Sequence, residues 1–185
     1  MSVTPEQAAE VWASADCLIP AKAMAKALDQ MAAAISADLA KLNPLLLCVM
    51  TGGVVTLGQL LPRLAFPLQV DYLHATRYDG DTQGGDDLRW LASPRISLSG
   101  RHVLVVDDIL DEGLTLAGIL AHCEDAGAAS VRSAVLVKKL HDRCVPGLRA
   151  DYCGESVPDR YVFGYGMDYH EYLRNADGIY AVAGQ

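Results

Sequence analysis

One stretch of the chain decides the fold: Arg101-His102-Val103-Leu104-Val105-Val106, followed directly by Asp107-Asp108-Ile109-Leu110-Asp111-Glu112-Gly113-Leu114-Thr115. Its run of consecutive valine and leucine residues predicts a strand that is buried on both faces. The acids, the glycine and the threonine stand at the start of a helix that is expected to extend to about Ala126, where Gly127 ends it. The stretch therefore predicts a buried strand, a polar turn and a helix.

The same alternation continues on both sides of this stretch. Residues 44–50 (PLLLCVM) predict a buried strand that ends at Thr51-Gly52-Gly53, and a helix from Val54 to Leu64 is expected next. Further strands are expected at Val70–Ala75 and Val131–Val137. Strands that alternate with helices in this way are typical of an α/β fold with a mainly parallel sheet.

The two ends of the chain predict shorter elements. Thr4-Pro5-Glu6-Gln7 supplies a capping hydroxyl, a proline at the first helical position and a glutamine three residues after the cap, which together start a helix. A second helix is expected from Ala21 to about Leu42, where apolar residues recur at helical spacing. Short strands are expected near Tyr152, at residues 161–163 and at residues 179–182.

The segment between the second and third predicted strands has a different character. Residues 78–87 (YDGDTQGGDD) are acidic, rich in glycine and without periodicity, and they predict a mobile loop. No repeat, low-complexity tract or linker interrupts the 185 residues, a length typical of one domain. We therefore expect residues 1–185 to form a single domain.

Composition and charge exclude several classes of protein. The formal net charge of −8 argues against a protein that coats nucleic acid, because such binding needs clustered lysine and arginine. No apolar run approaches the roughly 18 residues that would span a membrane, and no secretion signal is recognisable, so a cytoplasmic protein is expected. The cysteines are odd in number and scattered, which favours reduced, mostly buried thiols over disulfides or a zinc site. They are Cys17, Cys48, Cys123, Cys144 and Cys153.

The polar turn after the central strand is suited to a sugar phosphate. Ligands of an open α/β sheet lie beyond the carboxyl ends of its strands. Backbone N–H groups from Asp111 to Thr115 would point at a phosphate, with the positive end of the helix dipole behind them. Asp107 and Asp108 would accept hydrogen bonds from vicinal ribose hydroxyls. The alternative for two adjacent acids alone is helix capping or solvation, but the whole pattern from Val103 to Thr115 favours phosphate binding.

That pattern resembles the phosphoribosylpyrophosphate-binding motif of the type I phosphoribosyltransferases. In the motif an apolar strand precedes two acids, two apolar residues, an acid, a variable residue, glycine, another variable residue and threonine. Residues 50–53, 135–139 and 157–174 are similar to segments of one branch, the hypoxanthine-guanine phosphoribosyltransferases, and the resemblance extends from about Leu45 to Arg174. It implies the type I phosphoribosyltransferase fold: a mainly parallel central sheet flanked by helices, with a small hood formed by terminal segments.

The resemblance also implies an activity. It is purine salvage, in which the 5-phosphoribosyl group of 5-phosphoribosyl-1-pyrophosphate passes to hypoxanthine or guanine, giving IMP or GMP and pyrophosphate. The family uses Mg²⁺ as its cofactor and forms homodimers or homotetramers. No nucleic acid or membrane partner is expected.

The resemblance assigns roles to single residues of the purine site. Asp111 would be the general base at N7 of the purine, and Tyr78, at the start of the mobile loop, would close over the reacting centre. Lys138 would donate to the 6-oxo group of the base and Tyr161 would stack on its ring. Further contacts to the base would come from the Val162 carbonyl and from Asp168.

The remaining assignments concern the sugar, the leaving group and the metal. Mg²⁺ would be held by Asp168, Asp107 and Asp108. Pyrophosphate would be bound by Thr51, Gly52 and Arg174, in a loop where the family often has a cis peptide. The ribose and its phosphate would be bound by Asp107, Asp108, Asp111, Glu112, Gly113, Leu114 and Thr115.

Some positions depart from the family's pattern. Glu112 and Leu114 stand where many relatives have a small hydroxyl residue and a lysine, Thr51 stands where several have lysine, and Arg77 replaces a serine. A carboxylate pointing at a phosphate dianion would be repelled by about 4 kcal/mol at an effective dielectric near 20. We therefore expect the Glu112 side chain to point away from the phosphate, towards solvent or a cation.

Alternative functions differ in the base or in the class of protein. The same chemistry on xanthine stays open, whereas Lys138 argues against adenine, whose 6-amino group is a donor. A regulator of the same fold that binds the sugar pyrophosphate without turnover is a second alternative, and the acidic charge argues against it. A Rossmann nucleotide-binding protein is excluded because no G-x-G-x-x-G follows a strand.

Overall fold

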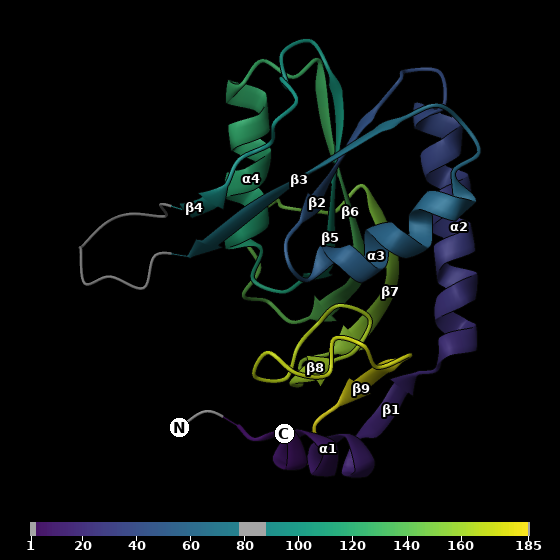
Figure 1. The fold of residues 1–185 in the computed structure, drawn as a ribbon, viewed down its shortest axis with the longest axis vertical. Coiled ribbons are helices and arrows are strands. Elements are labelled where there is room, and N and C mark those ends of the chain that lie inside the picture. The colour runs from purple at the N-terminus through teal and green to yellow at the C-terminus, as the bar shows by residue number, and fades with distance from the viewer. Residues whose placement is uncertain (1–2, 78–87, 185) are drawn as a thin grey trace.

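A six-stranded sheet forms the centre of the molecule (Figure 1). The computed structural model describes residues 3–77 and 88–184. The strands are arranged in the order β4-β3-β2-β5-β6-β7, and all neighbours are parallel except β3 and β4. Their bounds are β2 (Leu45–Val49), β3 (Gln69–Arg77), β4 (Leu88–Ala92), β5 (His102–Leu110), β6 (Ser130–Leu140) and β7 (Tyr152–Pro158). The expected α/β fold with a mainly parallel sheet is confirmed.

Helices cover both faces of this sheet (Figure 1). On one face α2 (Ala21–Leu39) and α3 (Gly53–Leu60), which continues as a 3₁₀ turn over Leu61–Arg63, pack on β2, β5 and β6 through one apolar cluster. On the other face α4 (Leu114–Asp125) packs on the same strands through a second cluster. All of β2 is buried, as its uninterrupted apolar sequence predicts.

A small hood is built from the two ends of the described chain. Strands β1 (Asp16–Ile19), β9 (Ile179–Ala181) and β8 (Val162–Phe163) form an antiparallel sheet in that order, and α1 (Pro5–Ser14) lies against it (Figure 1). The predicted cap of α1 is confirmed, since the Thr4 N–H donates to Gln7 Oε1 at 2.9 Å and the Gln7 N–H donates to Thr4 Oγ1 at 3.3 Å. The hood therefore brings residues near both termini over the carboxyl ends of β5 and β6.

Several predicted bounds were wrong. Helix α2 ends at Leu39 rather than near Leu42, because residues 40–42 form a turn. Strand β5 continues to Leu110, through residues expected in the polar turn, and β6 continues to Leu140. Strands β1 and β4 were not predicted. Each is short and depends on a partner, β1 on the distant β9 and β4 on β3, so neither has a local signal of its own.

The cysteines only partly fit the expectation. All five are free thiols, as predicted, but only Cys48 and Cys123 are buried. Cys17 and Cys153 are exposed and Cys144 is intermediate, so the prediction of mostly buried thiols was wrong. The two exposed cysteines lie on β1 and β7, the outer strands of their sheets, where alternate side chains face solvent. Within the described ranges, no helix is long and apolar enough to cross a membrane.

The core makes a first prediction. Leu46 lies fully buried in β2, so Leu46→Ala should lower the free energy of unfolding by about 2–5 kcal/mol through lost apolar contact and a residual cavity. Leu42, in the exposed turn after α2, is the control. Leu42→Ala should change the free energy of unfolding by less than about 0.5 kcal/mol. Urea unfolding at matched pH measures both, and equal effects would contradict the assigned core.

Candidate active site

The turn between β5 and α4 forms an open cavity. Gly113 precedes α4 with a left-handed backbone (φ +83°), which favours glycine, and a Cβ atom there would also displace the end of the Leu148 side chain. The free N–H groups of the first helical turn begin at Leu114. The cavity measures about 290 Å³ and is lined by every residue that the sequence assigned to the ribose and phosphate: Asp107, Asp108, Asp111, Glu112, Gly113, Leu114 and Thr115.

Two adjacent carboxyl groups lie at the inner end of this cavity. Asp108 is buried and Asp107 half-buried, and the Asp108 N–H donates to Asp107 Oδ1 at 2.9 Å. Burial raises the pKa of both carboxyls, and the charge of Asp108 raises the pKa of Asp107 further. Hydroxyl donors or a cation would offset this repulsion, and the pair is therefore prepared for a ligand that brings either.

The loop after β2 meets the same carboxylates. A Cβ atom on Gly52 would overlap the Asp108 carboxylate, and one on Gly166, which has φ +110°, would overlap the Gly52 carbonyl. Glycines thus allow the loop, Asp108 and the segment after β8 to approach closely. The Met50–Thr51 peptide is cis, as it often is in the family that the sequence resembles. The structure thus places Gly52 directly beside Asp108, whereas the predicted binding of pyrophosphate by Thr51 and Gly52 stays a prediction.

A second cavity of about 220 Å³ opens between the sheet and the hood. Asp108, Ile109 and Asp111 border both cavities, so Asp111 lies at the junction between them. The other lining residues come from β6, from β8 and from the residues that flank β8: Lys139, Tyr161, Val162, Met167 and Asp168. Tyr161, Val162 and Asp168 therefore lie where the sequence predicted the base.

Lys139, not Lys138, is the lysine of this second cavity. Strict alternation from Leu136 places Lys138 on the face of the sheet that carries the hood. In the structure both Leu136 and Val137 contact the cluster on that face, so the alternation shifts by one residue. The Lys138 ammonium instead lies near Cys153 of β7, where it opposes the burial that raises the pKa of that thiol. The structure thus does not bring Lys138 to the predicted purine site.

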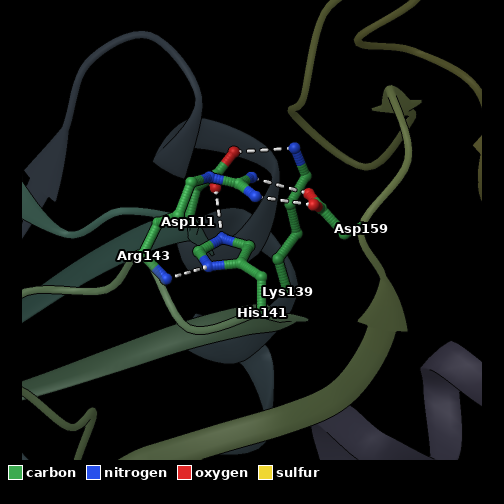
Figure 2. A network of polar contacts seen from close by, with 5 residues as sticks. All are labelled: Asp111, Lys139, His141, Arg143 and Asp159. Carbon is green, nitrogen blue, oxygen red and sulfur yellow. Dashed lines mark hydrogen bonds and ion pairs between the residues drawn. The ribbon is translucent and has the colours of Figure 1, made fainter.

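Asp111 is held by both of its carboxylate oxygens (Figure 2). Lys139 Nζ donates to Oδ2 at 2.7 Å, and His141 Nε2 lies 2.6 Å from Oδ1. Burial acts to raise the pKa of Asp111, but the hydrogen bonds from Lys139 and His141 outweigh it, and the net shift is downward. The carboxylate is therefore ionised and oriented at neutral pH.

Lys139 and His141 were not predicted from the sequence as site residues. Adjacent lysines at a strand end face opposite sides, and the shift after Leu136 reverses which one enters the cavity. His141 follows β6 in a segment without periodicity, so only the fold places it beside Asp111. The pairing of β5 with β6 indicates the position of Lys139. Leu110 pairs with Lys138, so the residues that follow them, Asp111 and Lys139, are expected to lie side by side.

Arg174 and Asp168 form an ion pair on the hood side of the cavity. Arg174 Nη2 lies 2.9 Å from Asp168 Oδ1 and 3.2 Å from Glu171 Oε2, and Nη1 donates to the Gly166 carbonyl at 2.8 Å. Its charge also acts on Asp108, where it opposes the burial that raises that pKa. The guanidinium thus lies near the pyrophosphate loop, although its described contacts are to residues of its own segment.

Tyr161 forms a wall between the second cavity and a third. It is 39% exposed, and its ring stacks on His170 with a centroid distance of 6.2 Å and an interplanar angle of 17°. Tyr169 meets it edge-on at 5.6 Å. The third cavity is lined by Val3, Tyr161, Asp168, His170, Glu171 and Tyr172. One ring face is thus supported by the hood, which suits a residue that stacks on a planar ligand.

The other predicted residues are placed as follows. Glu112 borders the first cavity. The hydrogen bond to Asp159 raises the pKa of Arg143, burial of the guanidinium opposes this, and the negative charge of Glu112 adds a smaller upward effect. Tyr78 and the rest of the expected loop lie outside the described residues. In the described part of the chain, no group of three or more His, Cys, Asp or Glu side chains is arranged to hold a metal.

The chain is similar in sequence and in structure to phosphoribosyltransferases. A family model described as the phosphoribosyl transferase domain matches residues 14–170. The hypoxanthine-guanine-xanthine phosphoribosyltransferase of Tritrichomonas foetus is 35% identical over 150 residues, which cover 81% of each protein. The hypoxanthine-guanine phosphoribosyltransferase of Streptococcus pneumoniae strain R6 is 31% identical over 150 residues, covering 81% of this chain and 83% of that protein. A solved hypoxanthine-guanine phosphoribosyltransferase from Bacillus anthracis superposes with a TM-score of 0.84 at 27% identity, covering 91% and 98% of the two chains.

The contacts of Asp111 make a second prediction. Because its folded pKa is lowered, the ionised carboxylate contributes stability above the ordinary aspartate pKa near 3.9, and that contribution is lost as pH falls through the folded value. Lys139→Gln should raise the pKa of the Asp111 carboxyl, whereas Lys138→Gln should leave it unchanged. Carbon-13 NMR titration of the carboxyl measures both. A shift in the Lys138 variant alone would contradict the assigned geometry.

Proposed function

The chain belongs to the phosphoribosyltransferase family, and on that basis we propose that it transfers the 5-phosphoribosyl group of 5-phosphoribosyl-1-pyrophosphate to hypoxanthine or guanine. The products are IMP or GMP and pyrophosphate. The observation that carries the proposal is the position of Asp111, which borders both the sugar-phosphate cavity and the base cavity. A group at that junction can act on the bond that joins a base to a sugar.

The base cavity offers the groups that a 6-oxopurine needs. Lys139, an ammonium donor, takes the role that the sequence had assigned to Lys138, because its side chain lines the cavity. An ammonium donates to a 6-oxo acceptor and has no acceptor for the 6-amino group of adenine. Tyr161 supplies the ring face, and the backbone of Val162 supplies the carbonyl for the base edge. These contacts support hypoxanthine and guanine over adenine.

Asp111 is the proposed general base. An ionised carboxylate at the junction can take the proton from N7 while the opposite ring nitrogen bonds to the anomeric carbon. Lys139 now occupies Oδ2 of Asp111, and a bound 6-oxo group would draw the ammonium away from it. Oδ2 then becomes the free acceptor for the N7 proton. A positioned base of this kind is worth about 10²–10⁴ in rate.

The sugar and the leaving group have separate binding elements. The N–H groups that begin α4 and the Thr115 hydroxyl would hold the 5-phosphate, which explains how a chain of net charge −8 binds an anion. Asp107 and Asp108 would accept from the ribose hydroxyls. Thr51, Gly52 and Arg174 would bind the pyrophosphate, with Arg174 exchanging a contact in its own segment for a phosphate oxygen.

The donor set fits Mg²⁺ when substrate is present. Asp107, Asp108 and Asp168 supply the carboxylate oxygens that this hard cation prefers. Since the described residues form no group of three such ligands, oxygens of the substrate and water must complete the coordination. Bound there, the cation supplies neutralisation of the departing pyrophosphate. Burial and mutual repulsion at Asp107 and Asp108 favour a bound cation for the same reason.

Xanthine is the second candidate base. The Tritrichomonas foetus relative is named for hypoxanthine, guanine and xanthine together. These bases share the 6-oxo group and differ at the 2-position, and Asp168, which lines the cavity, would be the carboxylate available to that position. The single domain over residues 1–185, the homodimeric or homotetrameric state, the cytoplasmic location and the outward position of the Glu112 carboxylate stay predictions.

Turnover tests the proposed function directly. The protein is incubated with 5-phosphoribosyl-1-pyrophosphate, Mg²⁺ and one base at a time, and nucleotide formation is followed by chromatography. IMP and GMP should form, AMP should not, and chelation of Mg²⁺ should stop the reaction. Binding of the sugar pyrophosphate without any nucleotide would support the non-catalytic regulator instead.

Replacement of the proposed base makes a further prediction. Asp111→Asn keeps the size of the side chain and removes its proton acceptor, so kcat should fall roughly 10²–10⁴-fold while the affinity for IMP changes little. Steady-state kinetics and calorimetric titration of IMP measure the two quantities. Asp29→Asn is the control, because it removes a carboxylate of α2 that pairs with Arg63 and lines neither cavity. A kcat within about threefold of the parent in Asp111→Asn would rule out the assigned role.

A further inference from the structure

His141 makes a contact that the proposed reaction does not use. It lies just after β6, and its side chain is 4% exposed. One ring nitrogen, Nε2, is 2.6 Å from Asp111 Oδ1, and the other, Nδ1, is 3.1 Å from the backbone nitrogen of Arg143 (Figure 2). His141 is not among the residues that line either cavity beside Asp111. It therefore reaches the carboxylate from behind.

The backbone of Arg143 decides the tautomer of this histidine. A backbone N–H only donates, so Nδ1 must accept and carries no proton. The proton of the neutral ring is then on Nε2, which donates to Asp111. A second proton on Nδ1 would face the Arg143 N–H. His141 is thus held as an N–H donor to Asp111, with its other ring nitrogen occupied by the backbone of Arg143.

The two donors to Asp111 have different fates when a base binds. Lys139 lines the base cavity and has the 6-oxo group as an alternative acceptor. His141 has no such alternative, because its ring is enclosed and its other nitrogen is occupied. Oδ2 is released for N7 while Oδ1 stays held. The carboxylate therefore keeps its orientation at the moment when it loses its ion pair.

We propose that His141 is a positioning residue for the catalytic carboxylate, holding Oδ1 of Asp111 so that Oδ2 faces N7 of the bound purine. The inference rests on the proposed function and extends it to a residue that does not touch substrate. Burial acts to raise the pKa of Asp111, and the hydrogen bonds from Lys139 and then His141 lower it. His141 therefore also contributes to the net lowering of this pKa.

The segment that carries His141 is braced against the phosphate turn. The Val145 N–H donates to the Glu112 carbonyl at 2.8 Å, and Leu148 and Cys144 approach Gly113. Arg143 makes two hydrogen bonds to Asp159, at 2.8 and 2.9 Å (Figure 2). This segment, residues 141–150, is therefore joined directly to the turn that contains Asp111. Such a brace is what a fixed distance between His141 and Asp111 requires.

Kinetics of His141 variants test the proposal. His141→Leu removes the donor and should lower kcat for IMP formation roughly 10- to 100-fold, the size of a misplaced catalytic group, with the KM of both substrates within about threefold. His141→Gln places an amide N–H near the position of Nε2 and should restore kcat to within about threefold. His102→Leu is the matched control, because His102 is also hydrogen-bonded, to Ser130 Oγ at 2.8 Å, but lies at the far end of β5.

A double-mutant comparison separates positioning from general stability. If His141 acts through Asp111, His141→Leu in the Asp111→Asn background should change kcat by less than about twofold. A full additional loss in that background would overturn the proposal, as would a kcat within threefold of the parent for His141→Leu alone. If His141→Leu does not fold, His141→Asn replaces it, since Asn is polar but too short to reach Asp111. Equal activity of the Asn and Gln variants would then overturn the proposal.

The same assay distinguishes this inference from the proposed function. Formation of IMP by the parent protein without a loss in the His141 variants would overturn the inference alone. Absence of IMP formation by the parent protein would overturn the proposed function, and the inference with it.

Discussion

The parallel pairing of β5 with β6 is the constraint on which the site depends. Its register pairs Leu110 with Lys138, so the next residues of the two strands, Asp111 and Lys139, come side by side and form an ion pair at 2.7 Å. Buried apolar residues on both faces of the strands favour this pairing, because a slip of one residue would exchange the side chains of the two clusters and disrupt their packing. The chemistry at the strand ends is thus positioned by the core, and the polar residues themselves need not hold the register.

The electrostatic problem at this place is severe for an acidic chain. Asp107, Asp108 and Asp111 approach one another where two phosphorylated groups are proposed to bind. The fold offsets this with helix N–H groups at the start of α4, with Lys139 and His141 on Asp111, and with Arg174 near Asp108. Most of these donor groups are supplied by segments distant from the turn in the sequence. Close approach at Gly52 and Gly166 lets the hood bring Arg174 over the sheet.

The predictable part of the molecule was the part with local signals. Uninterrupted apolar runs marked β2 and β5, and the capping pattern marked α1. The residues of the acid-rich turn line one cavity together, although its proposed role in phosphate binding stays a prediction. Short strands such as β1 and β4 escaped because their pairing partners, not their sequences, define them. Lys139 and His141 escaped for a related reason. The side that each lysine faces was reversed by the shift of the alternation after Leu136, which only the packed structure reveals.

A structure of the protein with bound IMP would test this account most directly. The account predicts that Lys139 Nζ leaves Asp111 and lies within hydrogen-bond distance of the 6-oxo group, while His141 Nε2 still contacts Asp111 Oδ1. A complex in which Lys138 contacts the base, or in which His141 has left Asp111 while Lys139 stays on it, would contradict the account.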